Sequence, residues 1–171
     1  CGTMSVGKTT LVNALKETEQ FKNYNFATER SKYLSDLGIP LNTDSTLKGQ
    51  TVFLAERCAE LMNENIITDR TVLDVMAFTL NAKSIPFQDK DAFEIYAQEF
   101  IREYDYIFYI SPYGLSIEDN GIREIDEHYR DLIDFTISTL IKKYAYKAKT
   151  IDTIRGTTEE RIQQILNITG L

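Results

Sequence analysis

The stretch Gly2-Thr3-Met4-Ser5-Val6-Gly7-Lys8-Thr9 decides the fold, because it matches the phosphate-loop pattern G-x-x-x-x-G-K-[ST]. Glycines let backbone N–H groups curl closely around a phosphate, and the start of a following helix favours the anion. Lys8 can reach the β- and γ-phosphates of a nucleotide, and the Thr9 hydroxyl can ligate Mg²⁺. The alternative reading is a glycine-containing turn that only caps a helix.

The residues around this stretch support the phosphate-loop interpretation. A helical pattern follows it, with Leu11, Val12 and Leu15 spaced to share one face. We therefore predict that residues 2–10, Thr10 included, bind a nucleotide. A loop of this kind follows a central parallel strand, which cannot be removed without opening the core. Since only Cys1 precedes the loop here, we expect about 6–10 further residues, one strand's worth, before it.

Composition indicates one globular domain that covers residues 1–171. Apolar residues make up 43% of the chain and charged residues 26%, which argues against a disordered chain or a disulfide miniprotein. No apolar run approaches the roughly 20 residues of a membrane span, and no secretory signal is recognisable. The net charge of −7 argues against a strong grip on nucleic acid. With only two cysteines, we expect a reduced, cytoplasmic location.

Short apolar runs alternate with helical periodicity along the chain, which predicts an α/β fold with a parallel sheet. The predicted strands are Tyr24–Thr28, Ile66–Asp69, Tyr106–Ile110 and Lys149–Ile151. The predicted helices after the first are Thr51–Asn63, Val72–Leu80, Asp89–Glu103, Ile125–Tyr144 and Thr158–Leu166. In the first of these helices, the apolar stripe is expected to contain Leu54, Cys58, Leu61 and Met62.

Charged residues follow the predicted strands at the edge where ligands bind in open α/β sheets. Glu29 and Arg30 follow the first of these strands, Asp69 and Arg70 the second, and the polar loop after the third carries Arg123. We expect all five residues to lie on the same edge as the phosphate loop. Phosphoryl transfer needs such positive groups and Mg²⁺ around an in-line reaction path.

Asp69 is the best candidate to hold Mg²⁺ beside Thr9, although an aspartate there could also cap the next helix. Arg70 could clamp the phosphate or sugar of an acceptor, or pair with Asp74 four residues on. Glu29 could accept a proton or bind a sugar hydroxyl, or simply face solvent.

Arg123 could be inserted over ATP by a closing loop, which would exclude water and stabilise the transferring phosphoryl group. Arg130 is a weaker candidate for the same role. The alternative for both arginines is ordinary surface pairing with neighbouring acidic residues.

Missing motifs narrow the class of phosphate-loop protein. The sequence contains neither Asn-Lys-x-Asp nor Asp-x-x-Gly, which a GTPase would be expected to show. Asp69 is followed by Arg70 and not by the glutamate that activates water in motor ATPases and helicases. The residues therefore favour phosphorylation of an acceptor over hydrolysis.

Several segments together resemble a known family, the small P-loop nucleoside and nucleotide kinases. They are the phosphate loop, Glu29-Arg30, the segment Asp69-Arg70-Thr71-Val72-Leu73-Asp74, and Asp119-x-Gly121-x-Arg123. The chain is most similar to an AAA-type ATPase-like group with ribosylnicotinamide kinase domains and thymidylate-kinase-like phage enzymes.

The resemblance implies a three-layer αβα fold with strand order 2-3-1-4-5, where strand 1 precedes the phosphate loop and is largely missing here. It also implies a lid at about residues 112–128, ATP and Mg²⁺ as cofactors, and an adenine site near Thr153–Thr158. Lys8 would bind phosphates, Asp69 would serve the metal or the substrate, and Arg123 would reach the phosphates from the lid. Glu29, Arg30 and Arg70 would contact the acceptor. A homodimer is compatible with the family.

The resulting interpretation is ATP-dependent phosphorylation of a nucleoside, a nucleoside monophosphate or nicotinamide riboside. One rival is a kinase acting on bases or ends of a nucleic acid, against which the acidic balance argues. A second rival is a nucleotide-binding switch with little catalysis.

Overall fold

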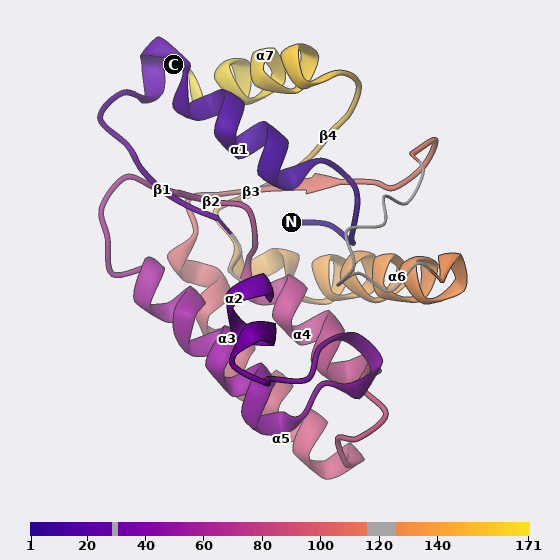
Figure 1. The fold of residues 1–171 in the computed structure, drawn as a ribbon. Coiled ribbons are helices and arrows are strands. Elements are labelled where there is room, and N and C mark those ends of the chain that lie inside the picture. Colours follow the sequence, from indigo (N-terminus) through magenta and orange to yellow (C-terminus); the bar gives the residue numbers. More distant parts are fainter. Residues whose placement is uncertain (29–30, 116–125) are drawn as a thin grey trace.

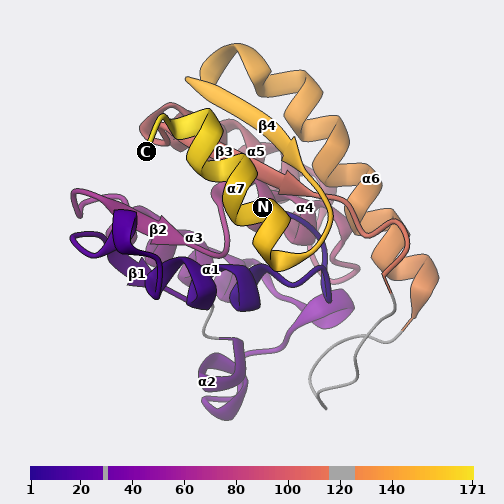
Figure 2. The same cartoon turned by 90° about the horizontal axis from the view of Figure 1, so that it is seen from above.

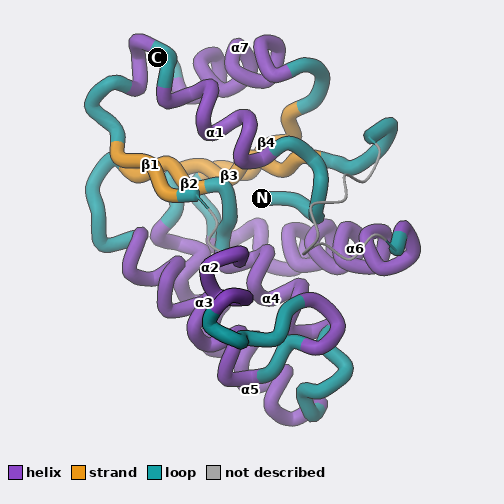
Figure 3. Tube along the Cα trace, viewed as in Figure 1, coloured by secondary structure: helices purple, strands orange, loops and turns teal. Residues whose placement is uncertain are grey.

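A computed structural model describes residues 1–28, 31–115 and 126–171 of the chain. Within these residues, short strands form the middle layer of a three-layer αβα arrangement (Figure 1). Helices α1 and α7 cover one face of the strands, and α3 to α6 cover the other, as Figures 2 and 3 also show. The strands are β1 (Asn25–Ala27), β2 (Ile66–Thr68), β3 (Tyr106–Ile110) and β4 (Thr150–Ile154). The helices are α1 (Lys8–Lys16), α2 (Ser31–Asp36), α3 (Leu47–Glu60), α4 (Val72–Asn81), α5 (Phe87–Ala97), α6 (Glu127–Tyr144) and α7 (Thr158–Thr169).

The strands pair in parallel, as the alternating pattern predicts. Strand β1 pairs with β2, with Phe26 opposite Ile67, and β3 pairs with β4, with Phe108 opposite Asp152. The backbone of Cys1 lies along the free edge of β3: its N donates to the Phe108 carbonyl (2.7 Å), and its carbonyl accepts from Ile110 N (3.0 Å). A groove of about 840 Å³ is lined by residues of both β2 and β3. The order of the two pairs across one sheet stays a prediction.

The layer of strands divides the core into two parts. The larger cluster is built around α4, where Val72, Leu73 and Met76 are fully buried between the strands and helices α3, α5 and α6. The smaller cluster joins α1 to α7 on the opposite face, through residues such as Leu15 and Ile165. Because α4 packs against the strands on one side and helices on the others, it is apolar nearly all round. No helix of the described residues is both long and apolar enough to cross a membrane.

The predicted helices and strands are present, with shifts at their ends. Helix α3 begins four residues early, at Leu47, because Thr46 caps it by accepting a bond from Gly49 N (3.1 Å). The same helix ends at Glu60, so Met62, expected on the apolar stripe, is 86% exposed and that expectation is wrong. Beyond Ala97, helix α5 continues only as a 3₁₀ turn. The short helix α2 carries no strong pattern and was not predicted.

Gly2 packs closely against the backbone of β3. Its φ is +150°, and a Cβ there would lie 2.7 Å from the Ile110 carbonyl oxygen, which is backbone and cannot move aside. We expect Gly2→Ala to lower the free energy of unfolding by about 2–4 kcal/mol, since overpacking adds to backbone strain. Urea unfolding followed by circular dichroism measures this loss.

Gly38→Ala is the matched control. Gly38 also has a positive φ (+79°), but a Cβ there meets nothing within 4 Å. Its cost should therefore be only the left-handed backbone term, about 1 kcal/mol. Equal losses in the two variants would show that the close approach of Gly2 to β3 contributes nothing.

Candidate functional site

The phosphate loop turns sharply between Cys1, which lies beside β3, and the start of α1. Ser5 and Gly7 both have positive φ values, +58° and +81°, and Gly7 is the residue that precedes the first turn of α1. Thr3, Met4 and Val6 are buried, so the loop is held from beneath by its own side chains. This is the curled backbone that the sequence motif predicts, and nucleotide binding by these residues stays a prediction.

The two functional side chains of the motif take up defined positions. The Lys8 ammonium donates to the carbonyls of Gly2 (2.7 Å) and Thr3 (2.6 Å), which holds it across the loop. The Thr9 hydroxyl donates to the Asp69 carboxylate (2.6 Å), so the two side chains lie together as expected, and their use as a metal site stays a prediction. The helix that follows Asp69 is capped by Thr71 instead, so the alternative role of Asp69 as a cap is wrong. Hydroxyl and carboxylate oxygens are hard ligands that suit Mg²⁺ when phosphates and water complete its shell.

Asp74 joins the phosphate loop to α4. One of its carboxylate oxygens accepts from Gly2 N (2.9 Å), and the other accepts from the backbone N (2.7 Å) and hydroxyl (2.9 Å) of Thr71. Burial raises the pKa of this carboxyl, but the positive charges around it, first the Cys1 ammonium and then Lys8 and Arg70, outweigh burial together with the Gly2 N–H. The net pKa is therefore lower than usual. The sequence interpretation treated Asp74 only as a partner for Arg70.

A second group of polar residues contacts the backbone of Arg70 at the end of β2. The fully buried guanidinium of Arg57 lies 2.5 Å from Glu60, and the Thr68 hydroxyl lies 3.0 Å from both Glu60 and the Arg70 carbonyl. Burial raises the pKa of Glu60, and Arg57 and Thr68 oppose this rise. These contacts fix the end of β2, so that the Arg70 side chain extends over the Phe78 ring, 5.2 Å from its centre.

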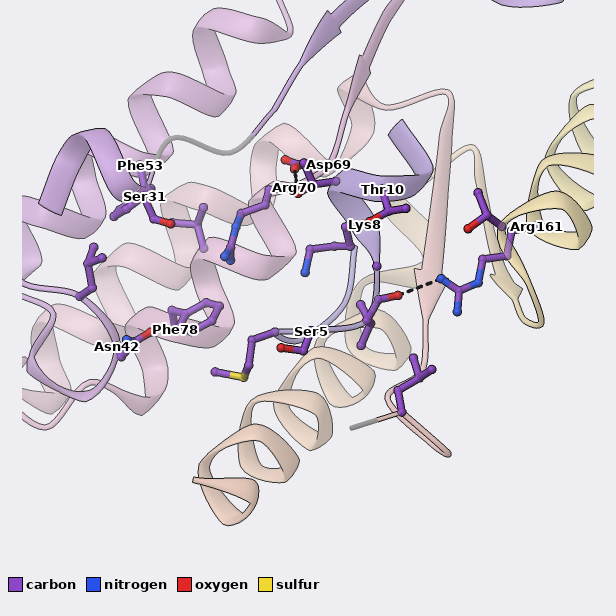
Figure 4. Close-up of a pocket in the computed structure, with 18 of the residues that line it drawn as sticks. Ser5, Lys8, Thr10, Ser31, Asn42, Phe53, Asp69, Arg70, Phe78 and Arg161 are labelled. Atoms are coloured by element: carbon purple, nitrogen blue, oxygen red, sulfur yellow. Dashed lines mark hydrogen bonds between the residues drawn. The ribbon is translucent and has the colours of Figure 1, made fainter. Parts of the chain in front are cut away.

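One pocket of about 400 Å³ contains the loop and the strand-end residues together. Figure 4 shows the side chains of Lys8 and Arg70 extending into the same space, with Phe78 beside it. The far wall comes from α3, α4 and the segment before α3, and it includes the buried amide of Gln50 among apolar side chains. The residues of that wall are Leu41, Gln50, Phe53, Val75 and Phe78.

Sequence reasoning missed this wall. Gln50 and Phe53 share one face of α3 with Arg57, at spacings of three and seven residues, and all three are buried. The spacing of Gln50 and Arg57 could have indicated a polar buried face. Only the apolar stripe that begins at Leu54 was predicted from the sequence. The predicted adenine segment is on the opposite side of the pocket, where Gly156, Thr157 and Thr158 line it together with Arg161.

Three predicted site residues, Glu29, Arg30 and Arg123, lie outside the described residues, and so does most of the predicted lid. Their roles stay predictions. Arg130, the weaker arginine candidate, donates to the Leu115 carbonyl (2.7 Å), and Leu115 lines the pocket. Arg130 therefore holds the chain where it leaves β3 for the predicted lid.

The loop, the Thr9–Asp69 contact and the layered sheet define a nucleotide-binding P-loop fold. The model of a family described as an AAA domain matches residues 1–161, so the chain belongs to that AAA domain family. No curated protein matches it.

Two solved structures of the deoxyadenosine kinase of M. mycoides have a similar fold. The one with bound dCTP is 18% identical with a TM-score of 0.68, and the one with the products dCMP and a flexible dCDP is 20% identical with a TM-score of 0.66. In both comparisons 99% of this chain and 96% of the other chain are covered. At this level of identity the likeness establishes the fold of the chain.

The bridge through Asp74 gives a testable prediction. An asparagine has one acceptor oxygen, so Asp74→Asn cannot serve both Gly2 and Thr71, and nearby cations lose their counter-charge. We expect the free energy of unfolding at pH 7 to fall by about 2–4 kcal/mol in urea titrations. Asp91→Asn, at an exposed position on α5, should stay within about 0.5 kcal/mol of the parent.

Acidification tests the same bridge independently. Because the folded-state pKa of Asp74 lies below its ordinary value of 3.8, its stabilisation is complete above that value. The stabilisation is lost as the pH falls through the folded pKa. The parent should therefore lose more stability than Asp74→Asn on acidification below pH 3.8. Parallel losses would contradict the role assigned to this carboxylate.

Proposed function

We propose that the chain transfers the γ-phosphoryl group of ATP to a nucleoside or nucleotide acceptor. The observation that carries the proposal is one pocket in which a phosphate loop faces Asp69 and Arg70, with a Gln50-containing wall beyond them. A nucleotide-binding switch would need the loop but not a second wall across the pocket from it. Phosphoryl transfer instead requires two substrates in line, which this arrangement supports.

The chemistry follows from the residues that line the pocket. Lys8 and Arg70 bring positive charge to the space where charge develops on the transferring group. Thr9 and Asp69 would hold Mg²⁺, which when bound neutralises charge on the β- and γ-phosphates. We further propose that Glu29 and Arg30 contact the acceptor sugar or phosphate, and that Arg123 reaches the phosphates from the lid.

The apolar side chains of the far wall suggest that the acceptor carries a flat base. Phe53 and Phe78 present aromatic surface on which a flat base can pack, and the Gln50 amide offers one donor and one acceptor to the edge of that base. The name of the structurally similar kinase adds deoxyribonucleosides to the candidate acceptors. Nucleosides, their monophosphates and nicotinamide riboside complete the set.

The direct test is a panel of these acceptors with ATP and Mg²⁺, in which formation of each phosphorylated product is measured by chromatography. We expect at least one nucleoside-class acceptor to be phosphorylated. Lys8→Ala should reduce the rate by about a hundredfold or more, because the charge on the transferring group loses its main counter-ion. Lys142→Ala, an exposed lysine on α6, should leave the rate unchanged. Rapid ATP hydrolysis with no phosphorylated acceptor would refute the kinase proposal.

Gln50→Leu tests the acceptor wall. Leucine keeps the approximate volume but removes the hydrogen bonds, so kcat/KM for the acceptor should fall by about ten- to a hundredfold, with KM for ATP unchanged. Gln88→Leu, at an exposed position on α5, is the matched control. If KM for ATP rises with Gln50→Leu while the acceptor kinetics hold, the wall has been assigned to the wrong substrate.

A further inference from the structure

Arg161 joins the last helix of the chain to the phosphate loop. Its Nη1 donates to the Val6 carbonyl (2.8 Å), across 155 positions of sequence. The side chain is 7% exposed and lines the same pocket as Lys8, approaching the loop from α7 (Figure 4). A buried arginine in a helix, with a loop carbonyl as its partner, costs stability unless its charge serves a purpose.

The peptide that Arg161 holds connects Val6 to Gly7. In a trans peptide the C=O and N–H point in nearly opposite directions, so fixing the Val6 carbonyl on Arg161 turns the Gly7 N–H the other way. In Figure 4 the Lys8 and Arg70 side chains extend into the space on the side of the loop away from Arg161. The Gly7 N–H is thereby directed away from Arg161 and toward the place where a phosphate would meet the lysine.

The Val6–Gly7 peptide can rotate unless another group fixes it. Rotating it changes ψ of Val6 and φ of Gly7, and a glycine accepts the new φ without a steric penalty. Gly7 already has φ +81°, and a Cβ there would lie 3.3 Å from Arg161 Nη1, so the guanidinium rests directly against it. The glycine that allows the loop to curl therefore also allows the Val6–Gly7 peptide, and with it the Gly7 N–H, to rotate.

The unused part of the guanidinium points to the same purpose. Arg161 Nε is buried and has no hydrogen-bond partner among the described residues. A residue kept only for packing between α1 and α7 would be more stable as an apolar side chain, as the neighbouring Ile165 and Leu166 are. The charge is instead placed against a single carbonyl of the phosphate loop.

We propose that Arg161 is a positioning residue for the donor nucleotide, which sets the Val6–Gly7 peptide so that the Gly7 N–H faces the phosphates. The inference rests on the proposed function only in that the loop binds a nucleotide. It assigns α7 a part in phosphate binding that is separate from recognition of the adenine base.

Binding measurements test the proposal with two probes, ATP and tripolyphosphate, which has the phosphates without the base. For Arg161→Met, calorimetry should give a Kd raised by the same factor for both probes, about ten- to a hundredfold, since one charge-assisted bond is lost. Arg161→Lys should recover part of the loss. Arg155→Met, an exposed arginine just before α7, removes the same charge without touching Val6 and should bind both probes normally.

Three results would overturn the proposal. A loss of ATP affinity with normal tripolyphosphate affinity would mean that Arg161 contacts the base. Unchanged affinity for both probes, or an equal loss in Arg155→Met, would remove any specific role at the loop. If Arg161→Met does not fold, Arg161→Lys and Arg161→Gln are compared by the same two probes, with thermal melting as the check on folding.

These outcomes are independent of the phosphorylation assay. If no acceptor is phosphorylated while Arg161→Met still weakens binding of both probes, the proposed function fails and the positioning role stands. If acceptors are phosphorylated and Arg161→Met binds normally, the reverse holds.

Discussion

The site depends first on the carboxylate of Asp74. It accepts the backbone N–H of Gly2, where the phosphate loop begins, and the N–H and hydroxyl of Thr71, where α4 begins. The Asp69-Arg70 segment immediately precedes Thr71, so the loop and the strand-end residues are held in one fixed relation. A buried charge of this kind is stable only while all its donors are in place. Loss of the Asp74 bonds would therefore disturb both the loop geometry and the Thr9–Asp69 contact.

The part of the fold that could be predicted from the sequence is the part written in local patterns. The phosphate loop, the strand Tyr106–Ile110 and the apolar helix from Val72 depend on spacing within about ten residues, and the structure contains all three. Asp69 could also be placed beside Thr9, because the carboxyl ends of parallel strands meet at one edge of a sheet. Helix ends were less accurate, since a cap such as Thr46 decides them through a single hydrogen bond.

The other site residues could not be predicted, because their roles arise from contacts between distant segments. Gln50 is one polar residue in a helix until α4 places Phe78 near it, and Arg161 becomes part of the loop only when α7 packs on α1. The role of Asp74 was incomplete for the same reason: a local pair with Arg70 is visible in the sequence, whereas a bond to Gly2 is not. Pocket walls are built from tertiary contacts, and local periodicity carries no information about them.

Charge placement reconciles an acidic chain with an anionic ligand. The chain carries a net charge of −7, yet the described lining of the pocket contains three cations, Lys8, Arg70 and Arg161, against the one carboxylate of Asp69. At physiological salt the field of a surface charge decays over about 8 Å, so a phosphate inside the pocket responds mainly to these nearest groups. The acidic exterior disfavours the extended polyanion of a nucleic acid, which must contact a broad surface. The acidic net charge therefore argues against a nucleic-acid ligand, which stays a prediction, whereas the cations that line the pocket suit a small polyphosphate.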